Sequence, residues 1–512
     1  MSEEEELPEG WASKPLDDLI EPGGIFDGPF GSRLKTSDYT DSGVRVMRLE
    51  NVANLAFVAD KQTFISESKY RTLIKHTVAE GDLLVGSFVD GAVRVCILPA
   101  LPTKAIAKAD CFCVRTERRV ADRRFIAFQL GRNETRDALV EEIHGATRPR
   151  INTKQLRALP IAVAPLPEQH RIVEQVEALL AQVNQAKGRL DRVKVILKRF
   201  RQAVLAAACS GRLTEEWRAK NSGWSTDASD FTVLLTGGDP QQAEPVGADL
   251  DFPEGWGLIS LDSGTSHLTS GSRAWKPYYR DDGFGTFVMA QNVRPLKFDR
   301  SFRQGVAPPE RDPERGRTTV RQGDLLVTIV GANTGDVCRV DVPVKDHFVC
   351  QSVALARPRI ETFSPFLELW LNSPMHGQAL YYEWAYGEGR PHLSFDHLRS
   401  TPLAVPGAAE QAEIVRIVQR MFVLADTIEA RLTTASTRAE KLPQSILSKA
   451  FKGELVPTEA ELARAEGRSF ETAEEMLERV KATTAGPKER ATKGPMDTRG
   501  SRGRRTSRST RS

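Results

Sequence analysis

Two glycine-containing loops carry the first residues in this sequence whose types suggest chemistry. Gly31-Ser32-Arg33 is followed by Lys35, and the same tripeptide returns at Gly271-Ser272-Arg273, followed by Lys276. Hydroxyl groups, cationic side chains and backbone N–H groups are the groups that hold phosphate oxygens. The loops therefore predict contacts with nucleic acid. The alternative is a pair of ordinary turns, each with a solvated arginine.

Further polar residues that could contact DNA lie in other loops and in two basic stretches. Arginine and asparagine are the side chains that pair with guanine and adenine edges, whereas other basic and hydroxyl groups mainly hold phosphates. The candidates are Ser87, Asn333 and Thr334 in loops and Arg148, Arg150, Lys154, Arg390 and His392 in two basic stretches. We expect Arg148 and Arg390 to contact phosphates and Asn333 and Thr334 to contact bases.

Motifs of common active sites are absent from the sequence. It contains no GxxxxGK[ST] phosphate loop, no HExxH, no GxSxG, and no Cys/His set at zinc spacing. It also lacks the Asn-Pro-Pro-aromatic motif of DNA amino-methyltransferases. We therefore expect no catalytic residue and no metal site in this chain.

The segments that contain these residues occur twice in the sequence, as an internal duplication. Leu7 to Trp11 returns as Phe252 to Trp256, and Gly81-Asp82-Leu83-Leu84-Val85 returns 242 residues later at Gly323 to Val327. From Arg148 onward the separation stays at 242 residues. A period this long exceeds any solenoid unit, so each copy must contain a complete domain. Asn51 and Asn292, within Glu-Asn-Val and Gln-Asn-Val, are predicted to be structural because both copies keep them.

Each copy begins with mixed strand and helix signals. The strands predicted in the first copy are 43–49, 82–89, 93–98 and 111–115, and in the second copy 285–290, 324–330, 337–342 and 348–356. The predicted helices are 123–130, 135–144, 365–371 and 376–385. Each copy is therefore expected to form an α+β domain. The sequence does not give the order of the strands.

The end of each copy carries an unbroken heptad pattern. Apolar residues recur at alternating steps of four and three from Ile172 to Val204 and from Ile414 to Ile446. The seam residues singled out are Ile172, Val176, Leu179, Val183, Leu190, Leu197, Ile414, Val418, Met421, Ile428, Leu432 and Leu442. So narrow a seam fits a partner helix of the same kind, so we expect an antiparallel coiled coil of two helices, each about 60 Å long. The alternative is that each helix packs only on its own domain. Pro443 predicts a kink or break.

These patterns give the following domain organisation. The segments are a first domain at 1–160, a helical region at 165–215, a linker at 216–251 with at most one short element, a second domain at 252–402, a helical region at 406–455 and a basic disordered tail at 456–512. From Pro487 to Ser512, nine Lys or Arg and two acids give a charge of +7, and the total of +3 leaves −4 for the preceding residues. The tail could bind polyanions without sequence preference, or it could be a solvated terminus without a role.

Composition limits the class of protein. With 40% hydrophobic and 27% charged residues, the chain is that of a soluble globular protein. Its longest apolar run, Ala203 to Cys209, is far below the ~18 residues of a membrane span. The acidic start and the six unpaired-looking cysteines predict a cytoplasmic protein with reduced thiols and no membrane contact.

The segment from Gly145 through Arg148-Pro149-Arg150-Ile151 to Pro165-Leu166-Pro167-Glu168-Gln169 resembles the junction between target-recognition domain and conserved helix in specificity subunits of Type I restriction-modification systems. The Pro-Glu-Gly-Trp motifs, residues 26–32 and Gly81-Asp82-Leu83-Leu84 also resemble that family. The resemblance covers about residues 7–216 and 252–458. The second junction departs from the pattern, since its sequence Val405-Pro406-Gly407-Ala408-Ala409-Glu410-Gln411 has lost the second proline.

This resemblance implies a non-catalytic adaptor. Each recognition domain would read one half of a bipartite double-stranded DNA target, and an antiparallel pair of helices would hold the domains apart and dock two methyltransferase subunits. Two restriction subunits could then join. S-adenosylmethionine, ATP and magnesium would be bound by those partners and not by this chain.

Two rival functions remain open from the sequence. One is a coiled-coil scaffold or regulator that reads no defined sequence, which isolation of its gene from those of a methyltransferase and a helicase-nuclease would favour. The other is a DNA methyltransferase that acts alone, which methyl transfer by the purified chain would support.

Overall fold

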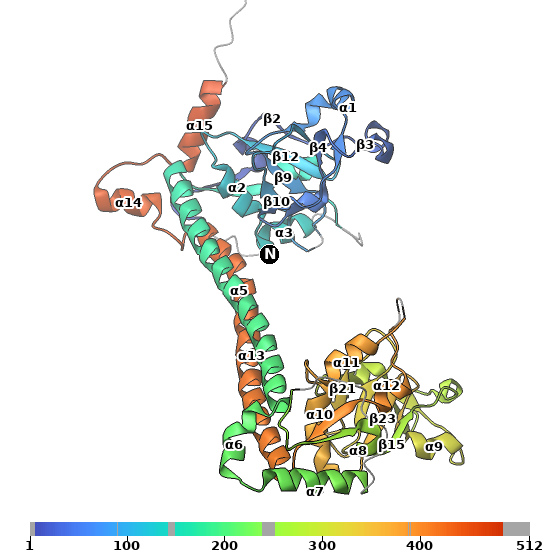
Figure 1. Cartoon of the computed structure of the whole chain (residues 1–512). Helices are drawn as coiled ribbons and strands as arrows, with labels where there is room; N and C mark the ends of the chain where they lie inside the picture. The colour runs from blue at the N-terminus through green and yellow to red at the C-terminus, as the bar shows by residue number, and fades with distance from the viewer. Residues whose placement is uncertain are drawn as a thin grey trace, which may run out of the picture. The chain divides into compact units, whose positions relative to one another are not determined.

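The computed structural model describes residues 6–89, 91–141, 149–237, 251–387, 389 and 391–484. The chain divides into two compact units, the first made of residues 1–186 with 438–512 and the second of residues 187–437. Each unit holds one globular domain, called domain 1 and domain 2, and part of each of two long helices (Figure 1). The units thus divide both predicted helical regions, 165–215 and 406–455, between them.

Domain 1 is built on an antiparallel four-stranded sheet and a mixed five-stranded sheet. The first has the order β10 (Val95–Ile97), β9 (Leu83–Gly86), β12 (Cys111–Thr116), β2 (Ile20–Phe26). The second has the order β3 (Tyr39–Thr40), β7 (Phe64–Ile65), β4 (Val44–Met47), β11 (Ala105–Ala107), β8 (Thr77–Val78), with β4 and β11 parallel. Two-stranded ribbons join β1 (Ala12–Pro15) to β13 (Pro160–Val163) and β5 (Val52–Ala53) to β6 (Ala56–Phe57). The helices are α1 (Glu67–Thr72), α2 (Arg123–Leu130), α3 (Asn133–Glu141) and α4 (Thr153–Ala158).

Domain 2 repeats this plan. Its four-stranded sheet has the matching order β21 (Val337–Arg339), β20 (Leu325–Thr328), β23 (Val353–Pro358), β15 (Thr265–Ser270). The other strands are β19 (Gln304–Val306), β16 (Gly285–Val288) and β22 (His347–Val349) in one sheet, and the ribbons β14 (Gly257–Ser260) with β24 (Pro402–Val405) and β17 (Val293–Arg294) with β18 (Lys297–Phe298). The helices are α8 (Leu261–Gly264), α9 (Pro313–Thr318), α10 (Ser364–Leu371), α11 (Gly377–Trp384) and α12 (Phe395–Arg399).

The predicted α+β class is confirmed, and most predicted elements are present. The helix predicted at Arg123–Leu130 is α2 residue for residue, and its counterpart α10 begins one residue before the prediction. The strand predicted over 348–356 is in fact two strands, β22 and β23. They belong to different sheets because the chain turns between Cys350 and Val353, where the Val353 N–H donates to the Cys350 carbonyl at 3.1 Å.

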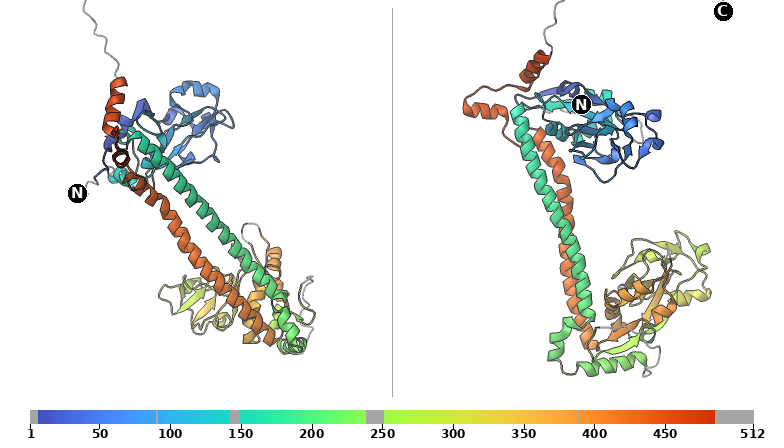
Figure 2. Two further views of the ribbon diagram at one scale, coloured as in Figure 1. Left: turned by 90° about the vertical axis from the view of Figure 1, so that its left-hand side faces the viewer. Right: turned by 45° about the horizontal axis from the view of Figure 1, so that its top comes forward.

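The two long helices, α5 (Leu166–Cys209) and α13 (Ala408–Phe451), pack on each other in both units. In the first unit Ile172 and Val176 share a buried cluster with Leu447 and Phe451. In the second, Leu197 forms a small cluster with Ala425 and Leu432. The early part of one helix thus meets the late part of the other, so the pair is antiparallel, and Figures 1 and 2 show the helices side by side.

Both helices also pack on the domains, but only near their ends. The alternative that each helix packs only on its own domain therefore does not account for the contacts between the two helices. Val204 and Cys209 near the end of α5 join Ile414 and Val418 near the start of α13 in the core of domain 2. The break predicted at Pro443 is wrong, because α13 continues through this residue to Phe451. A proline removes one backbone N–H, and burial of Leu447 and Phe451 in the core of domain 1 holds the last turns in place.

The prediction of a linker at 216–251 with at most one short element needs correction. This segment contains two helices, α6 (Glu215–Lys220) and α7 (Trp224–Thr236), whereas residues 238–250 lie outside the described ranges. Phe231 and Leu235 of α7 are buried in the core of domain 2. These apolar side chains, three to four residues apart, give α7 one buried face, so this part of the segment belongs to the domain.

The tail predicted at 456–512 needs the same correction over its first half. Residues 459–484 contain α14 (Glu459–Glu466) and α15 (Ala473–Thr484). Ala473, Met476, Leu477 and Val480 are buried in the core of domain 1, because α15 presents them on one face. Residues 485–512, which carry the basic charge, lie outside the described residues.

A tryptophan–glutamate hydrogen bond fastens the start of each domain to the start of a long helix. The indole N–H of Trp11 donates to Glu168 Oε1 at 2.9 Å, and that of Trp256 donates to Glu410 Oε2 at 3.0 Å. The further partners differ. Glu168 accepts the Glu459 backbone N–H at 2.8 Å, whereas Glu410 pairs with Arg218 Nη1 at 2.6 Å.

Candidate nucleic-acid interface

The repeated Gly-Asp-Leu-Leu motif is structural in both domains. Asp82 is buried and binds the Nε and Nη2 atoms of Arg115 at 3.0 and 2.9 Å, which ties β9 to β12. Asp324 is 1% exposed and binds the same atoms of Arg357 at 2.7 and 2.8 Å. The hydrogen bond to Asp82 raises the pKa of Arg115 above its already high ordinary value, so the guanidinium stays charged throughout the ordinary pH range.

The paired asparagines are structural, as predicted. Asn51 is 1% exposed, accepts the Arg48 N–H and donates to the carbonyls of Val58 and Lys61. Asn292 is 2% exposed and makes the equivalent three bonds in domain 2. Each buried amide therefore closes a loop and is not available to a base.

In domain 1 the predicted residue Arg150 reaches the surface at the end of β9. The segment around it pairs with the residues after β9, since Val89 N–H donates to the Pro149 carbonyl at 3.1 Å and Ile151 N–H to that of Ser87 at 2.9 Å. The Arg150 guanidinium lies 5.8 Å from the ring centre of Phe30 and 5.6 Å from that of Phe88. Its Nη2 atom lies 2.7 Å from Asp110 Oδ1.

Asp110, the partner of Arg150, also lines a cavity that contains further cations. This cavity, of about 280 Å³, is lined by Arg48, Arg94 and Lys108 together with Glu50 and Asp110. Arg48 is paired with Glu50 at 3.2 Å, so three basic and two acidic side chains share this hollow. Such a local excess of positive charge is suited to phosphate oxygens.

Domain 2 holds His392 at the equivalent place. Gly331 N–H donates to the Pro391 carbonyl at 3.1 Å, and Leu393 N–H donates to that of Ile329 at 2.9 Å, which repeats the pairing around Arg150. A cavity of about 260 Å³ opens here, and it is lined by Ser270, Arg273, Ile329, Val330, Gln351, Ser352, His392 and Phe395. The structure thus brings the predicted residues Arg273 and His392 together.

Comparison with known proteins decides the family. The family described as the Type I restriction modification DNA specificity domain matches residues 8–195. The specificity subunit of the Type I restriction enzyme EcoBI from Escherichia coli is 30% identical over 413 residues, which cover 79% of this chain and 80% of that protein. This chain belongs to the family of Type I restriction enzyme specificity subunits.

Two further similarities extend over more of the chain. The EcoKI specificity subunit from Escherichia coli strain K12 is 28% identical over 489 residues, 94% of this chain and 96% of that protein. A solved structure from work on the assembly and conformational transition of a Type I restriction-modification system matches with a TM-score of 0.58 and 18% identity. It covers 88% of this chain and all of the other, which supports the specificity-subunit fold.

The residues predicted to bind DNA fall into three groups in this specificity-subunit chain. The exposed ones are Ser32, Arg33, Lys35, Arg150, Lys154, Arg273 and Lys276, and His392 and Asn333 are half-buried. Arg33 ends a short 3₁₀ turn, Gly31–Arg33, and Lys154 lies in the first turn of α4. These side chains are accessible to a ligand.

Three predicted residues are held inside the fold. Ser87 is fully buried, and Ser272 is 3% exposed with its Oγ accepting the Ala274 N–H. The Thr334 hydroxyl donates to the carbonyls of Gly331 and Pro391 at 2.7 and 2.9 Å, so it closes its own loop. Their polar atoms are used by the protein or enclosed by it, so none is placed to meet a duplex.

Arg148 and Arg390, the predicted phosphate contacts, lie outside the described residues. The segments they belong to are described from Pro149 and from Pro391 onward. Their role therefore stays a prediction.

The Gly-Ser-Arg tripeptides are not structural equivalents. β2 pairs Phe26 with Cys113, and β15 pairs Thr269 with Leu355, which aligns the two strands at a separation of 243 residues. Gly28 then matches Gly271. A Cβ atom would lie 2.2 Å from the Lys108 carbonyl carbon at Gly28 and 1.8 Å from the Val349 carbonyl oxygen at Gly271, so only glycine fits either site. Phe30, and not Arg33, therefore stands where domain 2 has Arg273.

The coiled-coil seam is mostly enclosed, with two corrections. Ile172, Val176, Val183, Leu197, Ile414, Val418 and Leu432 are buried, and Leu179, Leu190 and Met421 are half-buried. Ile428 and Leu442 are exposed, at 38% and 40%. Both residues lie away from the helix ends. The domain cores cover the seam only near those ends, so Ile428 and Leu442 are covered by the partner helix alone.

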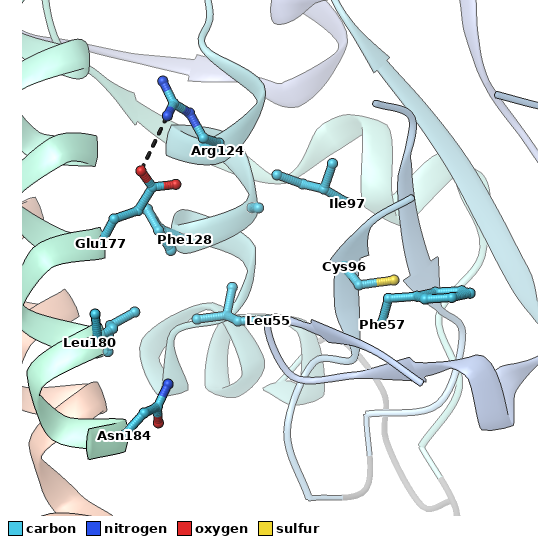
Figure 3. Close-up of a pocket in the computed structure, with 11 residues that line it drawn as sticks. Leu55, Phe57, Cys96, Ile97, Arg124, Phe128, Glu177, Leu180 and Asn184 are labelled. Atoms are coloured by element: carbon cyan, nitrogen blue, oxygen red, sulfur yellow. Dashed lines mark hydrogen bonds and ion pairs between the residues drawn. The ribbon is translucent and has the colours of Figure 1, made fainter. Parts of the chain in front are cut away.

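A further cavity, of about 360 Å³, lies in the first unit where domain 1 faces α5 (Figure 3). Leu55, Phe57, Ile97, Phe128 and Leu180 give it apolar walls, and Arg124 and Glu177 form an ion pair of 3.2 Å across one side. Burial raises the pKa of the Cys96 thiol in this wall to about 12. That thiol is therefore protonated near neutral pH and is a poor nucleophile.

The remaining features of the described chain concern its cysteines, its possible metal ligands and its helices. The six cysteines are free and buried, as predicted. Within residues 6–484, outside the gaps named above, no three His, Cys, Asp or Glu side chains are grouped to hold a metal ion. No helix in the same ranges is both long enough and apolar enough to span a bilayer.

Proposed function

We propose that this chain is the DNA-reading adaptor of a Type I restriction-modification complex. Domain 1 and domain 2 each bind one half of a split double-stranded target, and α5 with α13 docks two methyltransferase subunits. Two restriction subunits join where the system has them. The complex works in the cytoplasm, the compartment that the sequence predicts.

The observation that carries this proposal is the repeated site on a shared pair of helices. Both domains place a polar or basic side chain, Arg150 or His392, at the same backbone pairing after β9 or β20. Both domains also pack on the ends of α5 and α13. Two similar readers that share one pair of helices suit a target in two parts, and the differences between the readers allow the two parts to differ in sequence.

Chemistry is assigned to the partners. S-adenosylmethionine, ATP and magnesium are proposed to bind the methyltransferase and restriction subunits, with none bound by this chain. The polar groups of the repeated site support this, because Arg150, Asp110 and His392 are suited to recognition by hydrogen bonding. The buried thiols offer no reactive nucleophile.

Exposed apolar side chains on the coiled coil are the proposed docking surface for methyltransferase. Within the second unit, Val195 and Ile196 of α5 are 51% and 61% exposed, and Val423 and Leu424 of α13 are 64% and 58% exposed. Leu424 and the exposed Ile428 stand four residues apart and therefore share a helix face. Large apolar groups in water on a helix pair mark a surface for a protein partner.

The reading function is tested by mapping methylated bases genome-wide with the gene present and deleted. Loss of methylation at one split motif, two short sequences separated by unspecified bases, is expected. An unchanged methylation map in a strain that makes the whole complex would contradict the proposal and favour the scaffold alternative.

The docking surface is tested by co-purification of the full chain with its methyltransferase subunit. Ile196→Glu together with Leu424→Glu is expected to reduce the bound methyltransferase at least tenfold. Leu234→Glu is the matched control, because Leu234 is 64% exposed on α7, away from the coiled coil. Equal recovery of methyltransferase by both variants would contradict the assignment.

A further inference from the structure

Four positions in domain 1 and their equivalents in domain 2 converge on the repeated site. The register of β2 and β15 matches Phe30 to Arg273, and the separation of 242 residues matches Phe88, Asp110 and Arg150 to Val330, Ser352 and His392. In domain 1 the Arg150 guanidinium contacts the other three side chains. In domain 2 all four residues line one cavity. The convergence is therefore present in both domains.

The backbone beneath these positions is the same in the two domains. Ser87 N–H donates to the Asp110 carbonyl at 3.0 Å, and Ile329 N–H donates to that of Ser352 at 2.9 Å. Phe88 is bridged to Arg150, and Val330 is bridged to His392. The side chains nevertheless differ at all four positions, and at three of them a charged or polar group is gained, lost or exchanged. A shared frame with different side chains at its surface is the pattern expected where two readers bind different ligands.

The domain 1 site has the chemistry of a guanine reader. The Asp110 carboxylate holds one end of the guanidinium, and Phe30 and Phe88 lie within cation–π distance of it. A guanidinium has five N–H groups, so most of them stay free to donate to the O6 and N7 atoms of guanine. The Arg150 side chain is 44% exposed, and holding it in one orientation lowers the entropy cost of binding.

The domain 2 site offers a different set of groups. Arg273 replaces an aromatic ring, Ser352 replaces the carboxylate, and His392 replaces the arginine. Gln351 also lines the cavity and is exposed. Among the described residues, the His392 Nδ1 atom has no hydrogen-bond partner, and the His392 ring packs against Tyr386 with ring centres 5.3 Å apart. This set cannot present the fixed guanidinium of domain 1, so it suits a different base.

We propose that these four equivalent positions are the base-reading site of each domain, and that Arg150, oriented by Asp110, Phe30 and Phe88, reads a guanine in one half of the target. Lys154, Arg33 and Lys35 then hold phosphates around it. The inference rests on the proposed function, since it assigns the reading residues of that same activity.

The test is selection of bound duplexes from a random pool by the full chain with its methyltransferase subunit. Wild type is expected to select a split motif with guanine at one position of one half. Arg150→Gln is expected to lower the preference for that guanine by about 5- to 150-fold, the range of one bidentate contact, and to leave the other half unchanged. His392→Asn is expected to alter the other half alone. Arg150→Lys keeps the charge but loses the planar fork, so it should lose most of the guanine preference too.

Lys154→Gln is the matched control for a sequence-independent contact. It is expected to weaken binding to all duplexes alike and to reduce the salt dependence of binding, with the selected motif unchanged. The inference is overturned if wild type selects a motif and the Arg150 variants select the same motif at every position. If wild type itself selects no motif, the proposed function fails instead, so the two failures are distinguishable.

Discussion

Domain 1 and domain 2 share two sets of buried polar bonds and differ in their exposed side chains. Asp82 with Arg115 and Asp324 with Arg357 make the same ion pair, and Asn51 and Asn292 make the same three hydrogen bonds. At the surface, Phe30 and Arg150 are replaced by Arg273 and His392. The groups that hold the fold are thus the same in both copies, whereas those of the proposed reading site differ.

The ends of the domains show a second difference. Glu410 is matched by the cation of Arg218, whose side chain is 13% exposed. Glu168 accepts two neutral N–H groups, from Trp11 and Glu459, and burial raises its pKa. The two equivalent carboxylates therefore sit in unequal electrostatic environments.

The largest expected effect on stability comes from the shared ion pair. Asp324→Asn leaves the largely buried Arg357 without its counter-charge, so we expect a loss of about 3–5 kcal/mol from domain 2. Asp82→Asn should cost less, because the Arg115 side chain is 35% exposed against 20% for Arg357. Hydrogen exchange of the β12 and β23 peptides in urea measures both, and equal losses would mean that burial does not set the difference.

The coiled-coil seam offers the next effect. Leu197→Ala removes a side chain that is 8% exposed, so a loss of about 2–5 kcal/mol in local unfolding is expected. Leu442→Ala, at 40% exposure, should cost less than about 1 kcal/mol. Exchange rates of peptides from α5 and α13 give both values, and a large effect at Leu442 would show that the seam closes there in solution.

A smaller, pH-dependent effect is expected at Glu168. Its folded-state pKa is raised, mainly by burial, above the ordinary value near 4.5. The protonated form is favoured in the folded state, so this contribution to stability is full below that ordinary value and is lost as pH rises through the raised pKa. Glu168→Gln should flatten the dependence of stability on pH. Hydrogen exchange of the peptide around Trp11, measured over a range of pH, checks this. The same slope in the variant would assign it to other groups.

The smallest effect on stability is expected at Asp110. Its pair with Arg150 is exposed, at 37% and 44% of the two side chains, so Asp110→Asn should change stability by less than about 1 kcal/mol. Thermal denaturation checks this value. The same variant should still weaken the guanine preference, because the arginine loses its fixed orientation; unaltered stability together with unaltered preference would remove Asp110 from the reading site.

Much of the fold was predictable because its signals are local. Helix α2 and both long helices follow from apolar spacing, and the duplication follows from the repeated motifs. The helices of the C-terminal segment were missed because the composition of residues 456–512 is dominated by its basic end. Thr458 and Glu461 form a reciprocal capping box, and Ala473, Met476, Leu477 and Val480 keep helical spacing, so signals for both helices were present.

The site was predictable only in part. Arg150 and His392 were singled out because they lie within the two junction segments. Phe30, Asp110 and Ser352 were missed, since only the pairing of β2 with β12 and of β15 with β23 brings them to the site. The Gly-Ser-Arg match placed Arg33 opposite Arg273, three residues from the true equivalent, because short motifs recur by chance in loops of unequal length.

Exchange of the four reading side chains tests the account most directly. The full chain carrying Phe30→Arg, Phe88→Val, Asp110→Ser and Arg150→His would hold the domain 2 set on the domain 1 frame. Duplex selection with this variant is expected to change the half-site read by domain 1 toward that read by domain 2 and to leave the other half as it is. Recovery of the wild-type motif in both halves, by a variant that still binds DNA, would contradict the account.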